Sequence, residues 1–318
     1  MLSRVADSLY WMSRYLERAE HTARIVNVNL NLTLDRTPDD AARHWGRLLS
    51  SLRLPPPVPG TLTPFEHAAS ATLDLANRDS IAASIAAARE NARQVREQIS
   101  SEMWEQINRL FLAVREDSID ADWTGGAHAF LASAIEGVHL FQGITDATMT
   151  HGEGWRYIEL GRYLERASGT AALLDVHYRD FPGGRDQPTH VGEYVEWVAL
   201  LRSCSAFEAY CRHYTADLRS IRIAEFLILN ADFPRSIRFS AGRIQSCLKA
   251  IATLTGRGGR AERLAGRLLA SLDYGQVDEI VGDQLPAYLE GIVRQTLQIN
   301  AAVNQQYVQY PIDAALSA

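Results

Sequence analysis

The hexapeptide Arg14-Tyr15-Leu16-Glu17-Arg18-Ala19 recurs letter for letter at residues 162–167, which is 148 residues further along the chain. The same offset also aligns Thr22 with Thr170, Ala23 with Ala171 and Val28 with Val176. A chance match of six residues is improbable, and the spacing is too long for a solenoid repeat. The repeat therefore predicts two related helices within one bundle.

Apolar residues recur at helical spacing along nearly every long segment, and no alternating strand pattern competes with them. We expect an all-α multi-helix bundle in which two long helices, at residues 2–34 and 153–178, carry the two hexapeptides. Shorter helices are expected at residues 41–52, 64–77, 80–99 (capped by Asp79), 101–116 and 127–152, with a loop at 123–126 and more helices from 191 to 308. The later helices are expected to break near Pro234, Gly256–Gly259 and Gly282.

One helical domain is expected over residues 1–318. A possible subdomain break lies near residues 181–190, where prolines and glycines form the clearest linker in the chain. Helical bundles often carry such loops inside one domain, so both readings stay open.

The charged side chains of the first long helix share one face. Four of them fall within an arc of about 100°: Arg14, Glu17, Arg18 and His21. Apolar Ile25 lies on that face as well, and the second copy repeats this mixture. Apolar residues on both sides indicate helices enclosed by neighbours, whose charges need partners in a cleft or in the interior. The alternative is an amphipathic helix with its charges in water.

We therefore expect the Glu-Arg dipeptides of the two copies, at residues 17–18 and 165–166, to lie in one charged network between the two helices. A third candidate is the Glu90 and Arg93 pair, although an ion pair on a solvated helix surface explains it equally well. His21, four residues after Glu17, would be a proton-transfer group in a cleft, and a structural, hydrogen-bonded histidine is the alternative.

The composition excludes several classes of function. The net charge of −6, from 32 basic and 38 acidic residues, argues against nucleic acid as a partner. Lys249 is the only lysine, so Schiff-base chemistry would have to use that residue. The three cysteines form no secreted disulfide framework, and neither a signal peptide nor an apolar stretch of about 20 residues is apparent. We expect a cytoplasmic protein without a membrane segment and without a cofactor.

Three other groups of residues suggest sites, and each also has a structural explanation. Glu136 and His139 have the spacing of di-iron carboxylate bundles, yet no second such pair occurs, so no metal is expected. The loop Gly256–Arg260 lacks the Gly-Lys-Ser/Thr ending of a P-loop. Arg235 and Ser236, which follow a proline, would place a guanidinium and free N–H groups at a helix start, where anions bind. The alternative is that the proline simply begins that helix.

These residues together resemble a known family. The N-terminal block at residues 6–20 is similar to the alpha-E domain family, also catalogued as DUF403, which is named for its all-helical fold and a recurrent Glu-Arg motif. The resemblance continues at residues 88–93, 99–108, 162–167 and 230–236, so that it covers most of the chain.

Proteins of that family are commonly encoded beside, or fused to, circularly permuted ATP-grasp proteins and transglutaminase-like proteins. The resemblance therefore implies a component of an ATP-grasp-linked amide- or peptide-bond-forming system, with these proteins as partners. Whether the chain is an enzyme or only presents a substrate stays open. The alternative is a non-catalytic helical scaffold that binds the ATP-grasp enzyme, and a metal-dependent oxidase is a third, weaker hypothesis.

Under the leading hypothesis, a cleft lined by arginines and glutamates binds an amino-acid or peptide substrate. The candidate catalytic residues, which would accept an ammonium group or a proton, are Glu17, Glu90 and Glu165. The arginines that would hold carboxylate or acyl-phosphate oxygens are Arg14, Arg18, Arg93, Arg162 and Arg166. The remaining candidates for substrate binding are His21, Arg235 and Ser236.

Overall fold

The computed structural model describes residues 1–33, 37–54, 64–117, 123–181, 191–215, 217–280 and 284–308. These residues fold almost wholly into α-helices, and no strand occurs among them. The all-α multi-helix bundle expected from the sequence is therefore confirmed. Within the same ranges, no helix combines the length and the apolar character that crossing a membrane requires.

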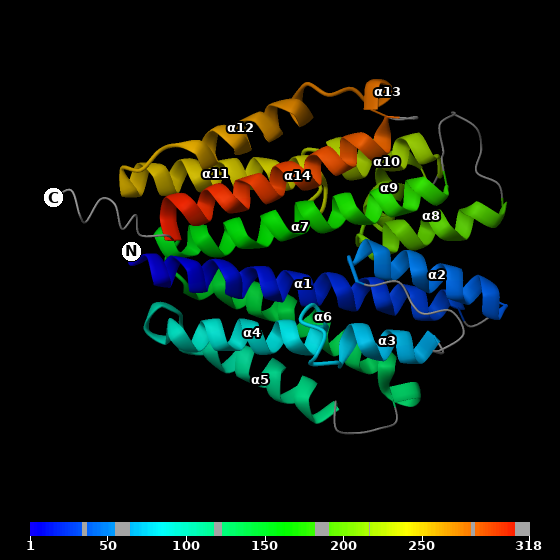
Figure 1. Ribbon diagram of the computed structural model, residues 1–318, viewed down its shortest axis with the longest axis horizontal. Helices are drawn as coiled ribbons and strands as arrows, with labels where there is room; N and C mark the ends of the chain where they lie inside the picture. Colours follow the sequence, from blue (N-terminus) through cyan, green and yellow to red (C-terminus); the bar gives the residue numbers. More distant parts are fainter. Residues whose placement is uncertain are drawn as a thin grey trace.

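Two long helices lie side by side at the centre of the bundle, as Figure 1 shows: α1 (Ser3–Thr33) and α7 (Glu153–Asp180). They run in the same direction. The N-terminal ammonium group bonds to Glu153 at the start of both helices, and His21 lies against Gly169 further along both. Their bounds agree with the expected helices to within two residues at each end.

The other helices cover this central pair on two sides (Figure 1). Beside α1 lie α2 (Pro38–Ser51), α3 (Pro64–Thr72), α4 (Ile81–Gln94) and α6 (Trp123–Thr148), with α5 (Ser101–Asp117) packed on α4 and α6. Beside α7 lie α11 (Ile237–Thr255) and α14 (Leu285–Val303), and α12 (Arg260–Asp273) packs on both. The remaining elements are η1 (Arg96–Gln98), α8 (Val191–Ser203), α9 (Phe207–Tyr214), α10 (Ser220–Leu229), α13 (Val277–Ile280) and η2 (Asn304–Val308).

Side-chain caps decide where several helices begin. Ser80, not Asp79, caps α4: its hydroxyl accepts a hydrogen bond from the Ala83 amide at 3.1 Å. The expected Asp79 cap is therefore wrong, and the carboxylate of Asp79 instead pairs with Arg18. Ser236 caps α11 in the same way, by accepting from the Phe239 amide at 3.0 Å.

Other expected boundaries also differ from the structure. Residues 123–126, expected to form a loop, are the first turn of α6, where two glycines cost only about 1 kcal/mol each relative to alanine. The helix expected to reach Ile99 ends at Gln94 and is followed by the short η1. The interruptions of the helix between α8 and α9 and between α9 and α10 were not expected. The linker at 182–190 and the break near Gly282 lie outside the described residues.

Both faces of α1 are buried, as its apolar pattern predicts. Leu16 and Ala19 pack on one side, while Ile25, on the charged face, is 0% exposed. Glu17 and Glu20 are also buried, which places ionised groups inside the bundle. The charges of the first hexapeptide therefore need partners from neighbouring helices.

Gly161 allows the two central helices to approach closely. A Cβ atom at this position would lie 2.4 Å from the backbone carbonyl oxygen of Tyr10 on α1. Backbone atoms cannot turn aside as a flexible side chain can, so any larger residue would push α1 and α7 apart.

Gly161→Ala should lower the free energy of unfolding by about 1–3 kcal/mol, the usual cost of overpacking a well-packed interior. Gly143→Ala in α6 is the matched control, because a Cβ at that position meets no atom within 4 Å. The control should gain about 0.5–1 kcal/mol from the better helix propensity of alanine. Chemical denaturation measures both, and equal stabilities of the two variants would contradict the close contact.

Candidate functional site

The two hexapeptides exchange ion pairs across the interface of α1 and α7. The guanidinium of Arg166 donates to both carboxylate oxygens of Glu17, with Nε–Oε1 at 2.6 Å and Nη2–Oε2 at 2.8 Å. In the opposite sense, Arg18 Nε on α1 donates to Glu165 Oε1 on α7 at 2.7 Å. The prediction that these four charges meet between the two helices is confirmed, although they form two clusters that are distinct in burial and access.

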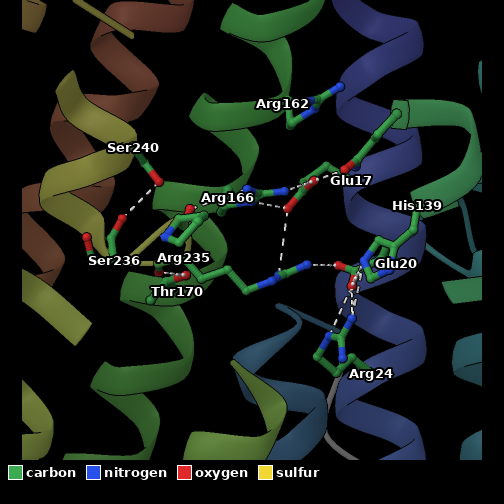
Figure 2. A network of polar contacts seen from close by, with 12 residues as sticks. Glu17, Glu20, Arg24, His139, Arg162, Arg166, Thr170, Arg235, Ser236 and Ser240 are labelled. Atoms are coloured by element: carbon green, nitrogen blue, oxygen red, sulfur yellow. Dashed lines mark hydrogen bonds and ion pairs between the residues drawn. The ribbon is translucent and has the colours of Figure 1, made fainter. Parts of the chain in front are cut away.

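The first cluster, called here the closed cluster, comprises Glu17, Glu20, Arg24, Arg166 and Arg235 (Figure 2). Arg235 donates to Glu20 and lies 3.8 Å from Glu17, and Arg24 Nε donates to Glu20 at 3.0 Å. Glu17 and Glu20 are 1% and 0% exposed, so both carboxylates of this cluster are shielded from solvent. Every guanidinium in it contacts a carboxylate.

Burial alone would raise the pKa of Glu17, but Arg166 and Arg235 outweigh it and hold that pKa below its ordinary value. The pKa of Glu20 lies well below its ordinary value because Arg235, His139 and Arg24 outweigh the same burial. Both carboxylates are therefore ionised and paired at neutral pH, as is typical of a structural ion-pair network.

The second cluster, called here the open cluster, comprises Arg18, Arg53, Asp79, Glu165 and Ser168. These residues line a cavity of about 130 Å³. Glu165 accepts hydrogen bonds from Arg18 and from Arg14, which lies behind it, and Arg18 also donates to Asp79 at 2.5 Å. These contacts lower the pKa of Glu165 to about 2, against the effect of its burial.

Arg53 differs from every arginine of the closed cluster. Its Nη2 donates to the Ser168 hydroxyl at 2.9 Å, and no carboxylate of the described residues forms an ion pair with it. The Arg53 side chain is exposed, and partial burial lowers the pKa of its guanidinium. Arg53 therefore offers an accessible guanidinium at the mouth of a polar cavity.

The two copies of the repeat differ in sequence where one cluster is closed and the other is open. The offset of 148 residues places Glu17 on Glu165, Arg18 on Arg166, Glu20 on Ser168 and His21 on Gly169. In each cluster, one arginine from outside α1 and α7 reaches the position of Glu20 or Ser168. Arg235 donates to the Glu20 carboxylate there, whereas Arg53 donates to the Ser168 hydroxyl and forms no ion pair with the residues that the structure describes. The smaller Ser168 and Gly169 leave the space that the cavity occupies.

His21 borders the same cavity from α1. Its Nε2 is buried and has no hydrogen-bond partner among the described residues, and a Cβ at Gly169 would lie 3.0 Å from it. Burial, with the nearby Arg235, lowers the pKa of His21 to about 4, although Glu20, Glu17 and Glu165 act in the opposite direction. The imidazole is therefore neutral at pH 7.

The fold and its paired Glu-Arg motifs match a known protein family. Residues 1–308 match Alpha-E, described as a predicted alpha-helical domain with a conserved ER motif. The chain belongs to the Alpha-E family. In this Alpha-E protein, Glu-Arg dipeptides stand at residues 17–18 and 165–166, and both are used across the α1–α7 interface.

Two curated relatives are uncharacterized proteins of mycobacteria. The protein from Mycobacterium bovis is 26% identical and the one from Mycobacterium tuberculosis H37Rv is 25% identical, each over 316 aligned residues that cover 90% of this chain. The Alpha-E chain spans about a third (34%) of the length of these relatives. No solved structure matches it.

The structure distributes the expected site residues of this Alpha-E protein over several places. Glu90 and Arg93 form an ion pair on the exposed surface of α4, apart from both clusters. Arg162 turns to Glu159, at 2.7 Å, instead of taking the position by Glu17 that its repeat partner Arg14 takes by Glu165. The α11 start is no free anion site, because Arg235 is already engaged by Glu20 and the Ser236 hydroxyl caps the helix.

The remaining motifs have structural roles. His139 lies 3.3 Å from Glu20, while Glu136 is exposed, and no group of three or more potential metal-ligating side chains occurs in the described ranges. In the Gly256–Arg260 loop, the carbonyl of Arg257 accepts hydrogen bonds from Gln306 and Tyr307 of the C-terminal η2.

Sequence reasoning did not find Arg53, Asp79, Ser168 and Glu20 as site residues. The 148-residue offset contains one signal for them: within an otherwise matched stretch, serine stands where the first copy has Glu20. No sequence signal places Arg53 or Asp79, because both reach the site from chain reversals outside the repeat.

Glu17→Gln in this Alpha-E protein should lower the free energy of unfolding by about 3–5 kcal/mol, because it leaves Arg166 buried without its counter-charge. Glu165→Gln should cost less, since the Glu165 side chain is 15% exposed and borders the cavity. Urea denaturation of the two variants measures the difference. A loss for Glu165→Gln as large as that for Glu17→Gln would contradict the distinction between the clusters.

His21→Asn should flatten the pH dependence of stability between about pH 6.5 and pH 4. In that range the unfolded chain protonates His21 while the folded chain does not, so wild-type stability falls as the pH falls. The variant lacks this contribution, which amounts to at most about 1.4 kcal/mol per pH unit. Denaturation at a series of pH values measures the slopes, and identical slopes would show that His21 titrates normally.

Proposed function

We propose that this chain is the substrate-binding component of an ATP-grasp-linked amide- or peptide-bond-forming system, and that its open cluster holds a carboxylate of the substrate. One observation supports the proposal: among the described residues, Arg53 hydrogen-bonds to a hydroxyl and forms no ion pair, at the position where the related half pairs its arginine with Glu20. A substrate carboxylate placed there would complete the open half as Glu20 completes the closed half.

The chemistry of the cavity suits such a ligand. Arg53 and Ser168 would donate hydrogen bonds to the carboxylate, in the charge-assisted geometry for which guanidinium groups are suited. Asp79, whose side chain is 48% exposed, would accept from an ammonium group at the cavity mouth. The cavity volume of about 130 Å³ equals that of about four water molecules, enough for a carboxylate and the atoms next to it.

The glutamates of the repeat fit a supporting role better than proton transfer. Glu165, with a pKa of about 2, stays ionised at neutral pH and is held by Arg14 and Arg18, so it is a weak base. Glu17 is fully paired with Arg166 and has no access to the cavity. ATP-dependent activation of the carboxylate would therefore take place on the circularly permuted ATP-grasp partner, and this chain would present the substrate.

The closed cluster favours a second candidate, in which the chain is a helical scaffold that only binds the partner enzyme. Its paired and buried charges are what fixing the helix register would require. The two candidates differ in what they require of Arg53, since a scaffold makes no use of it.

Arg53→Asn separates the two candidates. The Arg53 side chain is exposed and forms no ion pair within the described ranges, and asparagine tolerates the left-handed backbone at this position (φ 58°). The melting temperature should therefore stay within about 2 °C of wild type. Amide formation with the cognate ATP-grasp protein should nevertheless fall at least about tenfold, if the lost contacts contribute about 1.5–3 kcal/mol.

Melting temperature and product formation are measured on the same preparations. Arg238→Asn is the matched control, because that arginine pairs with Asp273 away from the cavity. Full product formation by Arg53→Asn would remove the substrate-binding role and leave the scaffold.

A further inference from the structure

A larger groove shares two lining residues with the cavity of the open cluster. The groove has a volume of about 350 Å³ and lies between α7 and α14, next to the end of α2. Arg53 and Ala172 line both the cavity and the groove, so the two spaces adjoin at these residues. A ligand group held by Arg53 can therefore extend along the groove without leaving the surface.

The groove combines apolar side chains with charged ones. Val176 of α7 and Val293 and Leu297 of α14 are the apolar lining residues. Asp175 and Glu290 stand among them and share Arg179 as a partner, with Arg179 Nε 3.0 Å from Asp175 Oδ1. Ser50 and Arg294 add further polar groups to the lining. A lining that combines apolar and polar side chains suits a peptide, with its apolar side chains and backbone amides, better than a purely aliphatic chain.

The lining decides which end of the ligand enters the cavity. Arg53 lines both the cavity and the groove, whereas Asp175, Glu290 and Arg294 line the groove and not the cavity. A carboxylate therefore belongs beside Arg53 and Ser168, and the groove, whose charged side chains are of both signs, receives the rest of the ligand. A peptide chain fits this arrangement when its free C-terminus enters first.

We propose that the ligand of this site is a peptide, recognised by its C-terminal carboxylate in the open cluster and by its preceding residues in the α7–α14 groove. This inference rests on the proposed carboxylate site and adds the class of substrate. It assigns Leu297 to specificity: Leu297 contacts the side chain of a residue before the C-terminus. A free amino acid would fill the cavity only.

The test is direct binding of three N-acetylated ligands with free C-termini, Ac-Ala, Ac-Leu-Ala and Ac-Ala-Leu-Ala, by isothermal titration calorimetry with the full chain. Affinity should rise about tenfold or more from the first ligand to the third, because an apolar side chain becomes buried on the groove. C-terminal amidation should abolish binding of all three, and Arg53→Asn should do the same.

Leu297→Glu should remove the gain with peptide length and leave the affinity for Ac-Ala unchanged. Leu254→Glu is the matched control, since Leu254 and Leu297 are both exposed leucines (60% and 50%) and Leu254 lies outside the groove. Retained wild-type helicity and melting temperature establish that each variant is folded. The control should keep the full dependence on length.

The possible results separate the two proposals. Arg53-dependent binding of Ac-Ala with no gain for longer peptides would overturn the peptide inference and leave the carboxylate site standing. Binding of decanoate more tightly than any peptide would assign the groove to an acyl chain and likewise overturn the inference. No carboxylate-dependent binding by any ligand would overturn both proposals.

Discussion

Glu17 of α1 pairs with Arg166 of α7, and Glu165 of α7 pairs in return with Arg18 of α1. Because glutamate and arginine are neighbours in both copies, the two parallel helices can form both bonds together in one register only. A slide of one helical turn, about 5.4 Å, would separate both pairs and leave buried charges without partners. The other helices pack around a central pair whose register this exchange fixes.

The same ion pairs also neutralise the charges of the repeated hexapeptide, which are the most noticeable feature of the sequence. Glu17 and Arg166 are saturated by each other and by the closed cluster, so they have no remaining capacity for a ligand. The proposed ligand site lies where the two copies differ. There Ser168 and Gly169 stand opposite Glu20 and His21 in the alignment, and the difference in side-chain volume becomes a cavity.

The helices and the meeting of the repeats were predictable because they depend on local periodicity and on the cost of burying a charge. Glu90 and Arg93 resemble the same pattern, but a spacing of three residues lets them pair within one helix at the surface, so they need no neighbour. Arg53 was not predictable, since its position follows from a left-handed turn at the end of α2. Asp79 was assigned to a helix cap, a role that Ser80 fills, and this leaves its carboxylate for Arg18.

The difference between the two halves is also the physical argument for a ligand. If both clusters served only to hold α1 and α7 together, a glutamate at position 168 would neutralise Arg53 as Glu20 neutralises Arg235. The open half instead combines an arginine, a hydroxyl and empty volume, an arrangement that contributes little to stability. Within the described part of the chain, Arg53 is held by one neutral hydrogen bond, and the nearby Glu165 is already paired with Arg14 and Arg18. A carboxylate brought from outside is the group that this arrangement accommodates, and the closed half provides the rigid helix pair on which it is presented.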